Sequence, residues 1–104
     1  MTAGEFRTLA LGHPGAMEGS HQNHPDFRVG KKIFASLGPD ETWAMVRLNP
    51  LDQMVFVKED LVAHKPANGA WGRSGCTIIQ LAIANKKLVK KAIYLAWDHC
   101  VQKP

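Results

Sequence analysis

Residues 76–103, CTIIQLAIANKKLVKKAIYLAWDHCVQK, join a strand pattern directly to a helix pattern, and this change of period decides the fold class. Side chains alternate through 76–84, with apolar residues on both sides, which is typical of a strand inside a sheet. Asn85 is a good helix cap, and the period after it is helical. The lysines of this helix lie mostly opposite an apolar side formed by Leu88, Val89, Ala92, Ile93, Ala96, Trp97 and Cys100.

Three more short strands are predicted upstream of this segment. DFRVGKKIFASLG (26–38) predicts two strands about a turn at Gly30 and Lys31. GPDE (38–41) predicts a second turn, and TWAMVRL (42–48) predicts a third strand. Successive strands with tight turns form an antiparallel meander. On the second of these strands, one face is expected to carry Ile33, Ala35 and Leu37.

The N-terminal segment predicts a helix followed by irregular chain. Thr2 and Glu5 match a capping box, and Gly12 and the following proline end the helix. Residues 15–26 are polar and show neither a helical nor a strand-like spacing of apolar residues, so we expect this segment to have no regular secondary structure.

The middle of the chain supplies another helix, a strand and a loop. Asn49-Pro50 is a typical helix start and predicts a helix over 50–58, although the apolar run 54–57 fits a strand equally well. DLVAHKP (60–66) predicts a strand, and GAWGRSG (69–75) predicts a glycine-rich loop. The predicted order is α-β-β-β-α-β-β-α, a two-layer α+β fold with helices packed on an antiparallel sheet.

Length and composition are those of one globular domain covering residues 1–104. Hydrophobic residues make up 45% and charged residues 21% of the chain. No apolar run approaches the ~20 residues that span a bilayer. Glu5 and Arg7 interrupt the apolar stretch that a signal peptide requires, so we expect a cytosolic protein whose two distant cysteines are thiols. The net charge of +4 permits an anionic partner.

Three motifs in this order and spacing resemble the MmcQ/YjbR family of small bacterial proteins. They are HPDFRVGKKIFASLG (24–38), WGRSGCTIIQL (71–81) and AIYLAWDHC (92–100), and the likeness extends from ALGHPGAMEGSH (10–21) to the end of the chain. The resemblance implies an α-β3-α-β2-α fold in two layers. It also implies a DNA-binding label that is based on shape alone, and no activity comes with the resemblance. Cys76 stands where the family usually has a bulky aromatic residue, which implies an altered surface there.

Cationic side chains and one tryptophan form the candidate binding surface. On the predicted strands and the glycine-rich loop, the basic residues suit phosphate contacts, and the indole suits stacking on a base. The predicted nucleic-acid-binding residues are Arg28, Lys31, Lys32, Arg47, Trp71 and Arg73. Two alternatives remain open: the strand cations are simply solvated, or Trp71 folds back as a lid on the sheet while Arg73 makes a structural ion pair.

Other functions have weaker signals in the sequence. A small-molecule pocket would be lined by His24, Phe27, Lys65 and Trp71, and a protein-interaction module of unknown partner is the main alternative to nucleic-acid binding. His21 and His24 have HxxH spacing with Asp26 nearby, but a zinc site needs three or four convergent ligands. No nucleophile elbow, P-loop or dinucleotide motif occurs, so we expect neither an enzyme nor a cofactor.

The sequence also allows expectations about the two cysteines and about His99. Cys76 beside Arg73 could act as a nucleophile only if His24 or His64 lay next to it. Cys100 and His99 fall within the apolar arc of the last helix, where we expect them to be packed.

Overall fold

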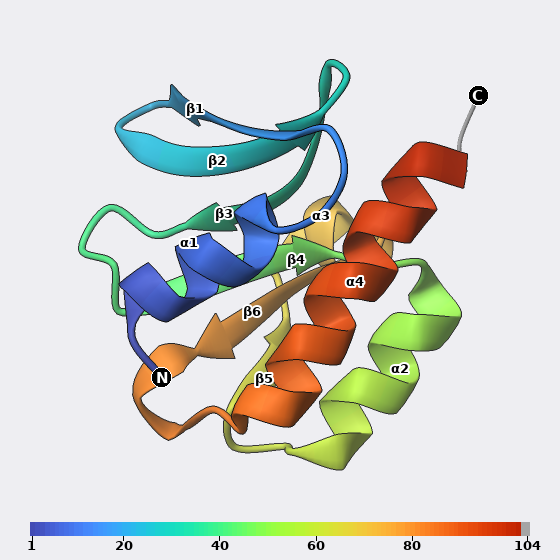
Figure 1. The fold of residues 1–104 in the computed structure, drawn as a ribbon. Coiled ribbons are helices and arrows are strands. Elements are labelled where there is room, and N and C mark those ends of the chain that lie inside the picture. The colour runs from blue at the N-terminus through green and yellow to red at the C-terminus, as the bar shows by residue number, and fades with distance from the viewer. Residues whose placement is uncertain (103–104) are drawn as a thin grey trace.

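The computed structural model describes residues 1–102 and contains an antiparallel sheet with helices against one face (Figure 1). The strands are β1 Ala16–His21, β2 His24–Val29, β3 Lys32–Leu37, β4 Trp43–Arg47, β5 His64–Pro66 and β6 Cys76–Gln80. The helices are α1 Ala3–Leu11, α2 Pro50–Glu59, α3 Gly69–Arg73 and α4 Lys86–Gln102, with a 3₁₀ turn at Leu81–Ile83. The strand order is β1-β2-β3-β4-β6-β5. The predicted α+β class is confirmed.

The helix starts follow the predicted capping residues. At α1 the Glu5 N–H donates to Thr2 Oγ1 at 3.1 Å, and the Thr2 N–H donates to Glu5 Oε1 at 2.9 Å. At α2 the Asn49 Oδ1 accepts from the Asp52 N–H at 2.8 Å, which settles 50–59 as helix. At α4 the Leu88 N–H donates to Asn85 Oδ1 at 3.1 Å. These caps satisfy N–H groups that have no partner within the helix.

The expectation that 15–26 is irregular was wrong. This segment forms β1 and the start of β2, a hairpin joined at Gln22 and Asn23, where φ is 49° and 65°. Positive φ at both turn residues matches the twist of a two-residue hairpin. β1 is an edge strand of the sheet and is largely exposed. Because neither face of it is fully buried, its sequence does not alternate between apolar and polar residues.

A bulge in β3 corrects the predicted faces of that strand. Phe27 pairs with Ala35 while Arg28 pairs with Ile33, so Phe34 is an extra residue on β3. Cross-strand partners share a face, and Phe27 and Arg28 point to opposite faces. Ile33 therefore does not share a face with Ala35 as predicted.

Two further segments differ from the prediction. In 60–66 only His64–Pro66 is a strand, because the Asp60 carboxylate accepts the N–H groups of Val62 and Ala63 and holds the preceding residues in a turn. Within the glycine-rich segment, 69–73 forms the short helix α3 rather than an open loop. The last predicted strand ends at Gln80 and continues as the 3₁₀ turn.

The pairing of β4 with β6 defines the two faces of the sheet. Ala44 pairs with Ile79 and Val46 with Thr77, and all four are fully buried beneath the helices. α4 contacts β3 and β4, and α2 contacts β5, β6 and α4. Cys100 is buried at the end of α4, as expected. Between residues 1 and 102, no helix has both the length and the apolar character needed to cross a bilayer.

Candidate binding face of the sheet

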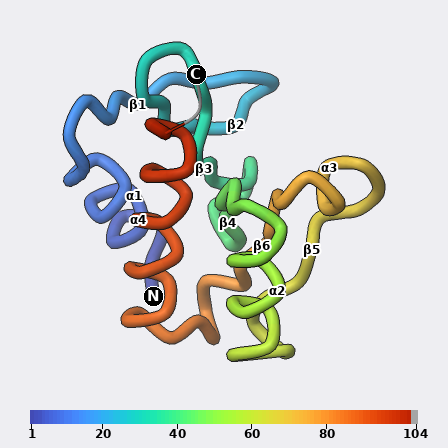
Figure 2. The backbone as a smooth tube through the Cα atoms, turned by 90° about the vertical axis from the view of Figure 1, so that its right-hand side faces the viewer, coloured from blue at the N-terminus to red at the C-terminus, as the bar shows by residue number. Residues whose placement is uncertain are grey.

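The second face of the sheet carries the outward residues of β4 and β6. Its pairs are Trp43 with Gln80, Met45 with Ile78, and Arg47 with Cys76, and Lys65 of β5 pairs with Ile78. Figure 2 shows α1 and α4 on one side of the sheet and α3 on the other. Trp43, Met45, Arg47 and Ile78 are only half-buried. This open face, with α3 at one end, is therefore available to a partner.

Glycines hold α3 against two other backbone segments. A Cβ on Gly72 would overlap the carbonyl oxygen of Ala67, and a Cβ on Gly75 would overlap that of Leu48. Gly75 also has φ 112°, which an L side chain rarely adopts. The Leu48 N–H donates to Gly75 O at 3.0 Å. Gly72 and Gly75 thus serve close packing rather than flexibility.

Gln53 of α2 ties α3 to β6 from inside the molecule. Its Nε2 lies 2.9 Å from Gly72 O, 3.1 Å from Cys76 O and 3.1 Å from Thr77 Oγ1, and its side chain is buried. A buried amide with this many partners fixes the relative positions of three elements. No local sequence pattern indicates this role, because the partners of Gln53 lie 19 to 24 residues further along the chain.

Trp71 is displayed on this anchored segment. Its side chain is 69% exposed, so it is not a lid over the sheet. Ser74 Oγ donates to Trp71 O at 2.8 Å and closes the end of α3. An exposed indole on a firmly held backbone is a stacking surface that loses little conformational freedom when a ring docks on it.

Of the predicted cations, Arg47 and Arg73 lie at the end of the open face where α3 joins β6. Arg47 is opposite Cys76, and Arg73 precedes Cys76 by three residues at the end of α3. Within the described part of the chain, neither arginine has a carboxylate within ion-pair distance, and the same is true of Lys65. We call Arg47, Lys65, Trp71 and Arg73 together the Trp71 face.

Arg28 is on the same side of the sheet but is already paired. Its Nε and Nη2 donate to the two oxygens of Asp26 at 2.7 and 3.0 Å, and His21 Nδ1 lies 2.8 Å from Asp26 Oδ2. Asp26 is fully buried, and Gly19 leaves room for the pair because a Cβ there would lie 3.1 Å from both partners. The Arg28 guanidinium holds the pKa of Asp26 below its ordinary value.

Lys31 and Lys32 do not lie near α3. Lys31 is in the turn between β2 and β3, and Lys32 is the first residue of β3. Both Figure 1 and Figure 2 place this turn beside the C-terminal end of α4 and away from α3. Consistent with this position, Cys100 Sγ lies 3.8 Å from Lys32 O. The candidate cations therefore divide into one group at Trp71 and another at the far turn.

A cavity of about 350 Å³ adjoins the Trp71 face between β4 and the chain that connects β5 to α3. Its lining residues are Trp43, Lys65, Pro66, Ala67, Asn68, Ile78 and Gln80. Of the predicted pocket residues only Lys65 lines it. Phe27 is fully buried against Phe6 with ring centroids 6.1 Å apart, and His24 contacts Trp43 edge-on at 5.9 Å.

The structure does not bring together the residues of the metal site and the cysteine nucleophile considered in the sequence analysis. His21 and His24 stack at 5.5 Å, but residues 1–102 contain no group of three potential metal ligands. Cys76 pairs with Arg47 on the open face, whereas His64 pairs with Ile79 on the helix-covered face. The two side chains therefore lie on opposite faces of the sheet. Burial raises the pKa of the Cys76 thiol, and nearby Arg47 only partly opposes this. The thiol is thus poorly suited to act as a nucleophile.

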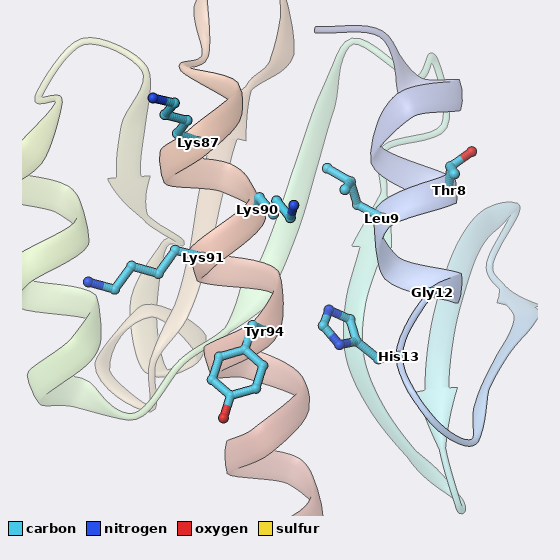
Figure 3. Close-up of a pocket in the computed structure, with 8 residues that line it drawn as sticks. All are labelled: Thr8, Leu9, Gly12, His13, Lys87, Lys90, Lys91 and Tyr94. Carbon is cyan, nitrogen blue, oxygen red and sulfur yellow. The ribbon is translucent and has the colours of Figure 1, made fainter.

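A second cavity of about 550 Å³ lies on the other side of the molecule, between α1 and α4 (Figure 3). It includes Lys87, Lys90 and Lys91, which the sequence had indicated only as a solvated helix side. Sequence reasoning missed this cavity because it depends on how α1 packs against α4.

A solved structure with a similar fold is known. The chain is similar to Deinococcus radiodurans protein DR2400, which has a DUF419 domain. The TM-score is 0.80 with 13% sequence identity, and the match covers 98% of this chain and 80% of that one. No family model matches the sequence, and no significant match was found among curated proteins. At this identity the likeness supports the fold alone.

Proposed function

We propose that this protein belongs with the MmcQ/YjbR proteins and binds nucleic acid through the Trp71 face, without catalysis. The three sequence motifs support the family assignment, and the two-layer α+β fold is of the kind that the resemblance implies. The observation that carries the function is the 69% exposed indole of Trp71 on a backbone anchored by Gln53 and its glycines. Arg47 and Arg73, which have no carboxylate partner within residues 1–102, lie at the same end of the open face as α3.

The chemistry of the Trp71 face favours single strands. Arg47, Lys65 and Arg73 neutralise backbone phosphates, and the indole stacks on a base that is free of a duplex. Arginine forks match phosphate oxygens in pairs. None of these contacts reads a base edge, so binding depends weakly on sequence.

Fluorescence anisotropy with a labelled single-stranded oligothymidylate tests the proposal. Stacking contributes about 1–3 kcal/mol per base, so Trp71→Ala should weaken binding about 5- to 150-fold. Three phosphate contacts predict a log–log salt slope of about −2 between about 50 and 200 mM salt. Arg73→Gln should reduce that slope by about one unit.

Matched variants on α2 provide the controls. Leu51 is an exposed apolar residue and Lys58 an exposed cation, and both lie outside the Trp71 face. Leu51→Ala and Lys58→Gln should leave binding unchanged. Equal effects of Trp71→Ala and Leu51→Ala, or a duplex bound more tightly than the single strand, would contradict the proposed mode.

The second candidate function is a protein-interaction module that pairs with a second copy of this chain. Leu51, Met54 and Val55 are 73%, 54% and 59% exposed and follow i, i+3, i+4 spacing along α2. An isologous pairing would cover this apolar row on both copies at once. Light scattering after size exclusion should then give a dimer that Val55→Glu dissociates, and a monomer at high concentration would rule the pairing out.

A further inference from the structure

The cavity between α1 and α4 joins cationic and aromatic side chains in one groove. Its volume of about 550 Å³ lies within the range of small-molecule sites. It is on the side of the sheet opposite α3, so it is separate from the Trp71 face (Figure 2). The lining residues are Thr8, Leu9, Gly12, His13, Lys87, Lys90, Lys91 and Tyr94, none of which is acidic.

The positive charge of this groove is not neutralised by the protein. Lys87, Lys90, Lys91 and Tyr94 follow i, i+3, i+4, i+7 spacing and share one face of α4. Lys86, one residue earlier, pairs with Glu5 at 3.1 Å. The three lysines of the groove have no such pair among the residues that the structure describes. One unpaired lysine amine in the groove, Lys90, with two more lysines on the same helix face, favours an anionic ligand.

On the α1 side of the groove, the His13 ring packs against aromatic residues of α4. The His13 ring lies 5.4 Å from Trp97 in a stacked arrangement and 6.0 Å from Tyr94. Trp97 Nε1 donates to Pro14 O at 2.9 Å and fixes the segment that carries His13. Burial lowers the pKa of His13, so its ring is a neutral planar surface at neutral pH. Tyr94 is 47% exposed.

We propose that this α1–α4 groove binds a nucleoside diphosphate. Lys90 holds the phosphates, and the base lies against Tyr94 and His13. In Figure 3, Lys90, Leu9 and His13 point into the space between the helices, whereas the Lys87 and Lys91 amines point to the other side of α4. Lys90 therefore makes the first phosphate contact, and the other two lysines join it by changing rotamer.

Isothermal titration calorimetry with ADP, pyrophosphate and adenosine tests both halves of the site. Wild-type protein should bind ADP saturably and bind the other two probes at least tenfold more weakly. The double variant Lys90→Gln/Lys91→Gln should weaken ADP binding at least tenfold. Tyr94→Leu should weaken ADP binding several-fold while leaving pyrophosphate binding unchanged. Lys58→Gln is the control for charge and should match wild type.

Three outcomes would overturn the proposal. The first is the absence of saturable binding of ADP to the wild-type protein. The second is pyrophosphate binding as tight as that of ADP together with indifference to Tyr94→Leu, which would show a cation cluster without a base site. The third is loss of ADP binding in Trp71→Ala but not in the lysine variant, which would place the nucleotide on the Trp71 face. Thermal melts of every variant separate lost binding from lost folding.

Discussion

Gly75 and Gly30 both have positive φ, yet only Gly75 also lies against another backbone segment. Nothing lies within 4 Å of a Cβ built on Gly30, whereas a Cβ on Gly75 would overlap Leu48 O. A left-handed φ alone costs a non-glycine residue about 1–2 kcal/mol. We therefore expect Gly30→Ala to cost about that much free energy of unfolding and Gly75→Ala to cost clearly more. Urea denaturation measures both, and equal costs would mean that the Leu48 segment yields without penalty.

The carboxylate of Asp26 makes the free energy of unfolding depend on pH in the acidic range. Hydrogen bonds from Arg28 are the main cause of its lowered pKa, opposed by burial and assisted by His21. A folded-state pKa below the unfolded value of about 3.9 means that the stabilisation is present above that pH and is lost as the pH falls through the folded pKa.

Asp26→Asn should remove this contribution. We expect the variant to lose about 1–3 kcal/mol at pH 6, because two side chains lose their charged acceptor, and the gap to wild type should narrow as pH falls below about 4. Urea unfolding at several pH values measures the gap. Asp40→Asn is the control for a lowered carboxyl pKa without an ion pair, since the Asp40 carboxylate accepts hydrogen bonds from Thr42 and has no cationic partner within residues 1–102. A gap that stays constant with pH would refute the assigned role of Asp26.

At the scale of elements, the parts predicted correctly are those that depend on neighbours in sequence. Capping boxes and Asn-Pro starts act within one helical turn, so the ends of α1, α2 and α4 follow from the residues themselves. β1 was missed because an exposed edge strand needs no apolar period. The exposure of Trp71 depends on contacts of Gly72 with Ala67 and of Gly75 with Leu48, which no local pattern reveals.

Gln53 offers a test of whether α3 is held by α2. Gly72 O and Cys76 O each keep a backbone donor, from Gly75 and Ala67, when the amide is removed. Gln53→Met should therefore cost only about 1 kcal/mol of stability, but it should loosen α3. Amide hydrogen exchange at Ser74 and Gly75 should speed up at least tenfold.

A second glutamine on the surface supplies the comparison for Gln53. Gln80 is exposed and makes no side-chain hydrogen bond within residues 1–102, so Gln80→Met should leave exchange in α3 unchanged. Unchanged exchange in Gln53→Met as well would mean that the glycine contacts alone anchor α3. Oligothymidylate binding should weaken in step with the loss of protection, because a mobile indole loses more freedom on stacking.

At the scale of the whole molecule, the sheet separates two unlike cationic surfaces. The Trp71 face presents arginines and an exposed indole at α3, and the α1–α4 groove presents lysines and half-exposed Tyr94 on the helix side. Figure 2 places α3 and α4 on opposite sides of the sheet. A ligand of nucleotide size cannot touch both surfaces, so their binding energies should be independent.

This independence predicts the outcome of a competition experiment. Saturating ADP should not displace labelled oligothymidylate from the wild-type protein beyond the effect of an equal ionic strength of NaCl. Combining Trp71→Ala with Lys90→Gln/Lys91→Gln should leave each ligand as weakened as in the relevant single-site variant, because the sites share no residue. Stoichiometric displacement of the oligonucleotide by ADP would show that one surface binds both ligands. In that case the variant that abolishes both signals identifies which side of the sheet is the binding side.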